Sequence, residues 1–166
     1  MVRQFKADAG YESVDLLKYG RGHLHAAEIL FLQDHHCLDS AAHLGHLAIE
    51  LLLKAALLHK SGSFPAEHDL SALLQEAATA GLPFTLSEDQ RVLLGAISPF
   101  EECRYPNPDN PIEIGTKDLE MIQQLWDTLL DQIPLELRAA FLEADQITKG
   151  GRTLFVNTPP SEPGAT

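Results

Sequence analysis

The residues best suited to chemistry form a narrow polar stripe in an otherwise apolar stretch. Between residues 38 and 58 most side chains are Ala, Leu, Ile or Gly. The polar residues recur there at intervals of four, three, four and four: Asp39, His43, His46, Glu50 and Lys54. On one helix these positions fall within an arc of roughly 60–80°. Burying unpaired charge is costly, so the stripe must face another polar surface, a solvent groove, a ligand or a partner subunit. Alternatively, it is the solvent-exposed edge of an amphipathic helix.

Histidine and cysteine raise the question of a metal or nucleophilic site. His43 and His46 lie one helical turn apart, and Asp39 or Glu50 could supply a third ligand. A catalytic zinc ion usually needs three protein ligands held by a fixed second shell, and helical spacing alone does not establish one. We therefore predict no metal site, and we expect Cys37 and Cys103 to be small buried residues. The chain also has no Gly-rich phosphate loop, Gly-x-Ser-x-Gly elbow or Cys-x-x-Cys pair, so we predict no cofactor.

Apolar periodicity indicates the elements that must position these residues. It predicts helices over residues 13–32 (loosened around Gly20 and Gly22), 38–58, 68–80, 87–99 and 116–133, with a sixth, short one over 134–144. The composition of residues 60–65 predicts a turn, and the three prolines within residues 104–111 predict a loop. Because no half-buried strand pattern appears, we predict an all-α, up-and-down bundle of four to five helices with a short C-terminal helix and an irregular tail. Residues 1–148 would form one domain, and 149–166 a flexible tail.

Size and charge narrow the possible partners. A chain of 166 residues is expected to form a single domain. Its net charge of −12 repels polyanions and argues against a general nucleic-acid coat protein. The sequence opens without a signal-peptide pattern, and the apolar run Leu51–Leu53 is interrupted by Lys54. We expect a soluble cytoplasmic protein with reduced thiols and no membrane association.

Three short segments, in this order, carry a family resemblance: Ala48–Ala55, then His68-Asp69-Leu70, then Arg104-Tyr105-Pro106. Together they resemble the HEPN family over roughly residues 11–133. The resemblance implies a bundle of four or five helices that usually forms a homodimer, with helix pairs from both subunits lining a central cleft. HEPN proteins include ribonuclease toxins of toxin–antitoxin systems, nucleotide-binding partners of minimal nucleotidyltransferases, and modules fused to other enzymes.

The ribonuclease branch of that family carries an Arg, four to six further residues and then a His. No histidine follows Arg104 in this chain, and Arg21 and His25 have only three residues between them and lie on a different helix. The Arg-Tyr-Pro form is instead similar to HEPN proteins proposed to bind nucleotides beside a nucleotidyltransferase. Arg104 offers a planar fork for phosphate or carboxylate, Tyr105 can stack or hydrogen-bond, and Pro106 stiffens the loop. Alternatively, Arg104 pairs with Glu50 or Glu101 as a structural latch.

These observations favour a non-catalytic HEPN-like module that forms a homodimer. It would bind a nucleotide or another small anion, or a partner such as a minimal nucleotidyltransferase. The predicted ligand-binding residues are Arg104, Tyr105, Lys54, Glu50, His46 and His43, with no catalytic residue among them. The alternative is a diverged ribonuclease that uses His43 or His46 together with Arg104, and only in that case is RNA a partner. We expect His68 and Asp69 to cap the third helix.

Overall fold

The computed structural model of the chain describes residues 4–6, 10, 12–33, 35–104, 109 and 112–150, without the side chains of residues 35, 104, 116 and 145–150. Apart from 149 and 150, the predicted tail lies outside the described residues. The elements, in order, are β1 (Gln4–Lys6), α1 (Ser13–Gln33), η2 (His35–Cys37), α2 (Leu38–Ser61), β2 (Ser63–Pro65), α3 (Leu70–Thr79), α4 (Glu88–Ile97), η3 (Ser98–Arg104), α5 (Thr116–Leu130) and α6 (Leu135–Gly150). The predicted all-α bundle is confirmed.

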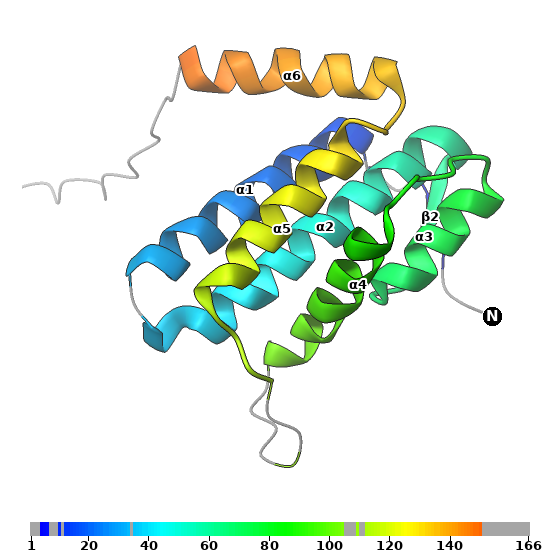
Figure 1. Cartoon of the computed structure of the whole chain (residues 1–166). Coiled ribbons are helices and arrows are strands. Elements are labelled where there is room, and N and C mark those ends of the chain that lie inside the picture. The colour runs from blue at the N-terminus through cyan, green and yellow to red at the C-terminus, as the bar shows by residue number, and fades with distance from the viewer. Residues whose placement is uncertain are drawn as a thin grey trace, which may run out of the picture.

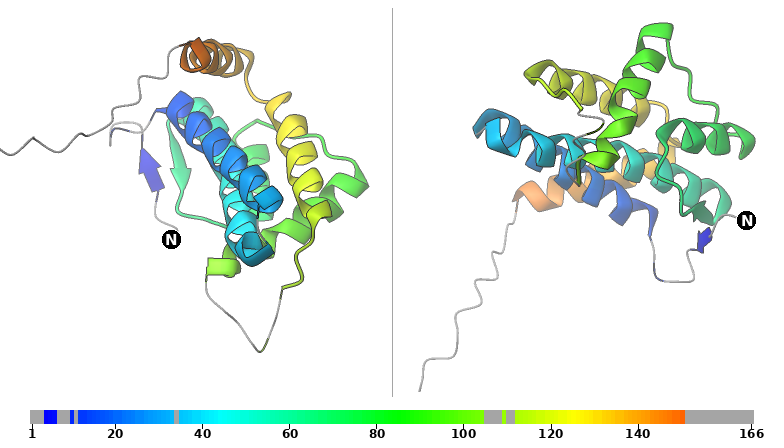
Figure 2. Two further views of the ribbon diagram at one scale, coloured as in Figure 1. Left: turned by 90° about the vertical axis from the view of Figure 1, so that its left-hand side faces the viewer. Right: turned by 90° about the horizontal axis from the view of Figure 1, so that it is seen from below.

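The bundle is built around α2. The helices α1 and α5 cover one side of α2, whereas α3, β2 and η3 cover the other (Figure 1). The last helix, α6, runs crosswise over one end of the bundle and contacts α1 (Figure 2). Most residues of α2 are buried, in agreement with its almost uninterrupted apolar sequence. Three of its polar side chains, those of His46, Glu50 and Lys54, are therefore buried inside the molecule.

Two glycines allow the central helices to approach closely. A Cβ added at Gly20 would lie 3.1 Å from the carbonyl oxygen of Ala48 and 3.1 Å from the ring of Trp126. At Gly45 it would lie 2.5 Å from Cδ1 of Ile122. The sequence predicted that glycines would loosen the first helix, but α1 continues through Gly20 without interruption. At this position glycine supplies space for packing rather than flexibility.

The ends of the other elements show where the predictions were sound and where they were not. A capping box at Ser87 begins α4, with Ser87 Oγ accepting from Gln90 N and Gln90 Oε1 accepting from Ser87 N. The sixth helix is longer than predicted and extends to Gly150. The predicted turn at residues 60–65 contains Gly62, whose φ of 70° ends α2, but β2 follows it immediately.

The sequence did not predict the small sheet. Strands β1 and β2 pair antiparallel, with Phe5 opposite Phe64, and Figure 2 shows them side by side. The two rings stack with their centroids 5.4 Å apart. Strands of three residues are too short to show an alternating pattern, which explains why they were missed. The pair holds the N-terminal segment against the end of α2.

Within the described residues, α2 alone is long and apolar enough to cross a membrane by length and composition. In the fold, 78% of its most apolar window is buried. Such burial is what the core helix of a bundle requires.

Candidate functional site

Four side chains from α2 and from the segment before α3 form a polar cluster, the buried polar cluster, which we define as His46, Glu50, Lys54 and His68. His46, Glu50 and Lys54 lie on α2 and are 0%, 3% and 5% exposed. His68 precedes α3, and its side chain is 47% exposed. The stripe on α2 is therefore not a solvent-exposed edge. Its central residues lie inside the fold, and His68 is the member that reaches the surface.

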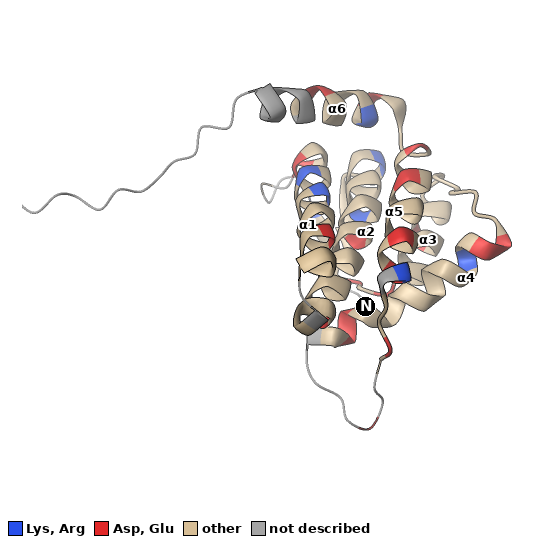
Figure 3. Cartoon of the chain, turned by 60° about the vertical axis from the view of Figure 1, so that its left-hand side comes forward, with Lys and Arg blue, Asp and Glu red and all other residues tan. Residues whose placement is uncertain are grey.

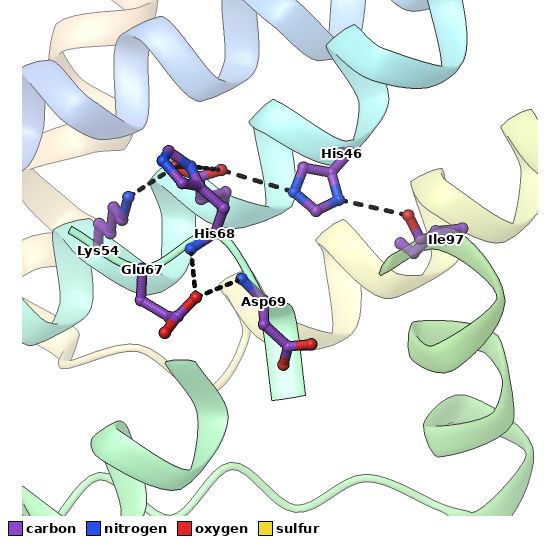
Figure 4. Close-up of polar contacts among 7 residues, drawn as sticks. His46, Lys54, Glu67, His68, Asp69 and Ile97 are labelled. Atoms are coloured by element: carbon purple, nitrogen blue, oxygen red, sulfur yellow. Dashed lines mark hydrogen bonds and ion pairs between the residues drawn. The ribbon is translucent and has the colours of Figure 1, made fainter. Parts of the chain in front are cut away.

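Glu50 is the centre of the cluster, because its carboxylate contacts all three other side chains. Figure 4 shows Lys54, His68 and His46 close together around this point. Lys54 Nζ donates to Glu50 Oε1 over 2.6 Å, as their four-residue spacing on one helix allows. His68 Nδ1 lies 3.2 Å and 3.1 Å from the two carboxylate oxygens. Lys54 Nζ also lies 5.7 Å from the centre of the Phe64 ring, within the range of a cation–π contact. The ion pair of Glu50 and Lys54 is thus enclosed by α2, β2 and the start of α3.

His46 links Glu50 to the far end of α4. Its Nδ1 lies 3.3 Å from the carbonyl oxygen of Ile97, and its Nε2 lies 3.5 Å from Glu50 Oε2. Both oxygens only accept hydrogen bonds, so a neutral ring can donate to one of them and a protonated ring to both. Neither ring nitrogen is directed at an open surface.

The segment before α3 holds His68 in place. Glu67 Oε1 accepts hydrogen bonds from the backbone nitrogens of His68 (2.9 Å) and Asp69 (3.1 Å). Asp69 then caps α3 by accepting from Ala72 N over 2.7 Å, as predicted. His68 does not cap the helix as expected, but reaches across to Glu50. The residue was missed because this contact spans 18 positions in the chain, although it stands beside Asp69 in one of the three family segments.

The surroundings keep Glu50 ionised. Burial is the largest influence on the pKa of Glu50 and acts to raise it. Hydrogen bonds from His46 and Lys54, the charge of Lys54 and the hydrogen bond from His68 outweigh burial and lower the pKa to about 2. At neutral pH the cluster therefore contains a carboxylate with a lysine ammonium beside it.

The remaining predicted residues are less closely joined. His43 is half-buried on α2, and Asp39 is exposed near the start of that helix. The backbone of Arg104 ends η3, which packs on α2, but its side chain lies outside the described residues, as does all of Tyr105. The structure brings His46, Glu50 and Lys54 together and leaves the proposed role of Arg104 and Tyr105 open to experiment.

Neither cysteine is fully buried, contrary to expectation, since Cys37 and Cys103 are both of intermediate exposure. Burial, followed by the charges of Asp39 and Glu102, raises the pKa of the Cys103 thiol to about 11. A thiol with so high a pKa is a poor nucleophile at neutral pH. Within the part of the chain that the structure describes, no three His, Cys, Asp or Glu side chains are grouped to hold a metal ion.

The surface beside the cluster is acidic. A hollow of about 370 Å³ is lined by Asp69, Ser98, Glu101 and Glu102, among others. Asp69 follows His68 in the chain, and Ser98 follows Ile97, the partner of His46. Figure 3 shows further acidic residues along α5 and at the start of α4. A polyanion approaching His68 from this side would be repelled.

Chemically, the cluster holds an imidazole ring against a carboxylate. Because carboxylate oxygens only accept, His68 Nδ1 must carry a proton when it contacts Glu50. In the neutral ring the lone pair then remains on Nε2. This arrangement orients His68 at the surface, whereas His46, Glu50 and Lys54 are occupied with one another.

Comparison with known proteins agrees with this architecture. The HEPN domain family model matches residues 13–130, which extend from the start of α1 to the end of α5 and include the whole buried polar cluster. Searches of curated proteins and of solved structures found no match. Since the family model covers well over half of the chain, this protein belongs to the HEPN domain family.

Proposed function

We propose that this protein is a non-catalytic HEPN module that acts by binding. In this proposal it forms a cytoplasmic homodimer that takes up a nucleotide or another small anion, or docks a partner such as a minimal nucleotidyltransferase. The observation that carries the proposal is the burial of His46, Glu50 and Lys54 in contact with one another. Side chains paired in this way build a rigid scaffold and are withheld from a reacting substrate.

Arg104 and Tyr105 are the proposed ligand contacts. Arg104 ends η3, which covers the same helix that carries the cluster. An arginine fork pairs well with phosphate, and a tyrosine ring can stack on a nucleobase. The acidic surroundings favour a small ligand held by such a local site over a long polyanion.

Calorimetric titration with ATP and with other nucleoside triphosphates tests the nucleotide part of the proposal. We expect wild-type protein to bind at least one of them and Arg104→Ala to lose the binding. Arg138→Ala is the matched control, because Arg138 pairs with Asp131 over 2.6 Å near the start of α6. If no nucleotide binds at millimolar concentration, the nucleotide part is removed.

The partner and dimer parts of the proposal have separate tests. Large apolar side chains remain exposed in the monomer, including Leu32 on α1 (80% exposed) and Leu135 on α6 (74% exposed). Exposed apolar surface of this kind often forms part of a protein–protein interface. Light scattering after gel filtration is expected to give twice the mass of one chain. Co-purification with a nucleotidyltransferase is the expected result for the partner, and a clean monomer would contradict both parts.

The ribonuclease alternative now depends on His43. His46 is fully buried and both of its ring nitrogens face protein oxygens, so it cannot take a proton from an RNA hydroxyl without a rearrangement. Incubation of single-stranded RNA with wild type, His43→Ala and Arg104→Ala tests this alternative. Cleavage that either substitution abolishes would overturn the non-catalytic proposal, whereas cleavage that neither affects would indicate a contaminating nuclease.

A further inference from the structure

A second site lies between α3 and α4, apart from the buried polar cluster. The structure has a hollow of about 470 Å³ there, lined in part by the segment that joins the two helices. Ligand sites in proteins commonly have volumes of roughly 300–1,000 Å³ and combine apolar side chains with a few polar groups. The walls here include Leu74 and Ala78 from α3, Phe84 and Leu86 from the connecting segment, and Leu94 from α4.

A single cation, Arg91, stands at this hollow. Its Nε donates to the carbonyl oxygen of Leu86 over 3.4 Å, which turns the side chain back toward the connecting segment. Arg91 forms no ion pair with any residue that the structure describes, although the chain has 24 Asp and Glu against 12 Lys and Arg. The rest of its guanidinium group is left for an anion.

We propose that this hollow binds a small amphipathic carboxylate. The carboxylate pairs with Arg91, and the hydrocarbon part lies against Leu74, Phe84 and Leu94. Ser71 and Gln75 line the same hollow and offer further hydrogen-bond donors. An arginine fork matches the two oxygens of a carboxylate, and the apolar walls gain from covering the chain.

The combination of groups selects this class of ligand. A purely apolar molecule leaves the arginine without an anion, and a highly charged nucleotide has no use for the apolar walls. The capping box at Ser87 fixes the first turn of α4, so Arg91 is presented from a rigid helix one turn further on. The site makes no use of Arg104, Tyr105 or the buried polar cluster, so the proposal is independent of the function proposed above.

Titration of ¹⁵N-labelled protein with octanoate, followed by amide chemical shifts, tests the proposal. We expect shifts concentrated in α3, residues 83–86 and α4, with saturation in the millimolar range or below. Octanamide has the same chain without the charge and is expected to bind about tenfold more weakly, because it loses a charge-assisted pair. Arg91→Gln is expected to weaken octanoate binding by a similar factor and to leave the affinity for octanamide unchanged.

Two further variants make the test specific. Ala78→Phe places a ring in the hollow from an exposed helix position and is expected to abolish octanoate binding while the amide spectrum stays folded. Arg138→Gln removes an arginine elsewhere and is expected to bind octanoate as wild type does. The proposal is overturned if octanoate shifts residues outside this site, if octanoate and octanamide bind equally, or if neither binds at millimolar concentration.

Discussion

Replacing Glu50 by Gln preserves the shape of the side chain and removes its charge, so this variant isolates the contribution of the buried ion pair. Lys54 would then be a buried ammonium without a counterion, since it is only 5% exposed. Breaking a buried pair in this way usually costs about 3–5 kcal/mol. We expect Glu50→Gln to lower the free energy of unfolding by that amount in a urea titration. Glu76→Gln, on the exposed face of α3, is the control and should change it by less than about 0.5 kcal/mol.

The loss of stability caused by Glu50→Gln should depend on Lys54 remaining charged. Adding Lys54→Met to Glu50→Gln removes the orphaned cation, and replacing both members of a buried pair by uncharged groups is often nearly neutral. We expect the double variant to be more stable than Glu50→Gln alone. If it is less stable by the full cost of a second substitution, the two residues are energetically independent and the ion pair does not organise the interior.

The pH dependence of stability provides a second prediction for Glu50. Its pKa is about 2 in the folded protein, below the ordinary value of 4.5, so the unfolded chain takes up the proton first as pH falls. The stabilisation is complete above pH 4.5 and is lost between pH 4.5 and about 2; over this interval it corresponds to about 3 kcal/mol. Chemical denaturation at pH 6, 4 and 3 should therefore show wild type losing its advantage over Glu50→Gln. Parallel curves for the two proteins would show that Glu50 has an ordinary pKa.

At the level of single residues, sequence spacing predicted part of the site but not all of it. Spacing along α2 predicted that His46, Glu50 and Lys54 share a face. Spacing could not show whether that face meets solvent or protein, because this depends on where α3 and η3 pack. For the same reason His68 was assigned to the helix cap, although it contacts Glu50 from a distant part of the chain.

At the scale of elements, the two glycines on α1 differ in whether a neighbouring helix packs against them. Gly20 is buried against the Ala48 carbonyl and the Trp126 ring, whereas a Cβ at Gly22 meets nothing within 4 Å. Alanine is the better helix former by about 1 kcal/mol, so Gly22→Ala should stabilise the protein by up to that amount. Gly20→Ala gains the same propensity but crowds a backbone oxygen and a large ring, so we expect a net loss of about 1 kcal/mol or more. Thermal unfolding of both variants measures the difference.

Opposite signs for these two variants would confirm that α1 is a continuous helix pressed against α2 and α5. Equal stabilisation would mean that α1 does not pack closely against its neighbours at Gly20. Helices with a strong apolar period, such as α2 and α5, were predicted to within a few residues. The paired strands were not predictable, because β1 and β2 are three residues long and depend on contacts between Phe5 and Phe64.

The start of α4 allows a prediction about local order. Ser87 Oγ accepts a hydrogen bond from Gln90 N, and Gln90 Oε1 accepts one from Ser87 N. Replacing Ser87 by Ala leaves a backbone donor without its partner, which typically costs about 1 kcal/mol. Hydrogen exchange should show faster exchange of the first-turn amides of α4 in Ser87→Ala, with α1 and α2 unchanged. Uniform acceleration across the bundle would instead show that α4 unfolds only with the whole protein.

At the scale of the whole molecule, the charge of −12 governs encounters with polyanions. A protein that binds RNA through phosphate contacts loses affinity as salt increases, because each contact releases counterions. In this protein the long-range field acts in the opposite direction, and screening weakens a repulsion instead of an attraction. The acidic hollow beside His68 adds to that field locally.

We therefore expect an anisotropy titration with fluorescently labelled single-stranded RNA to show no binding at any salt concentration between about 50 and 200 mM. A short peptide rich in Lys and Arg serves as the positive control for RNA binding, and its affinity should fall as salt rises. Salt-sensitive binding by the wild type would instead contradict the expected repulsion and would favour the ribonuclease alternative.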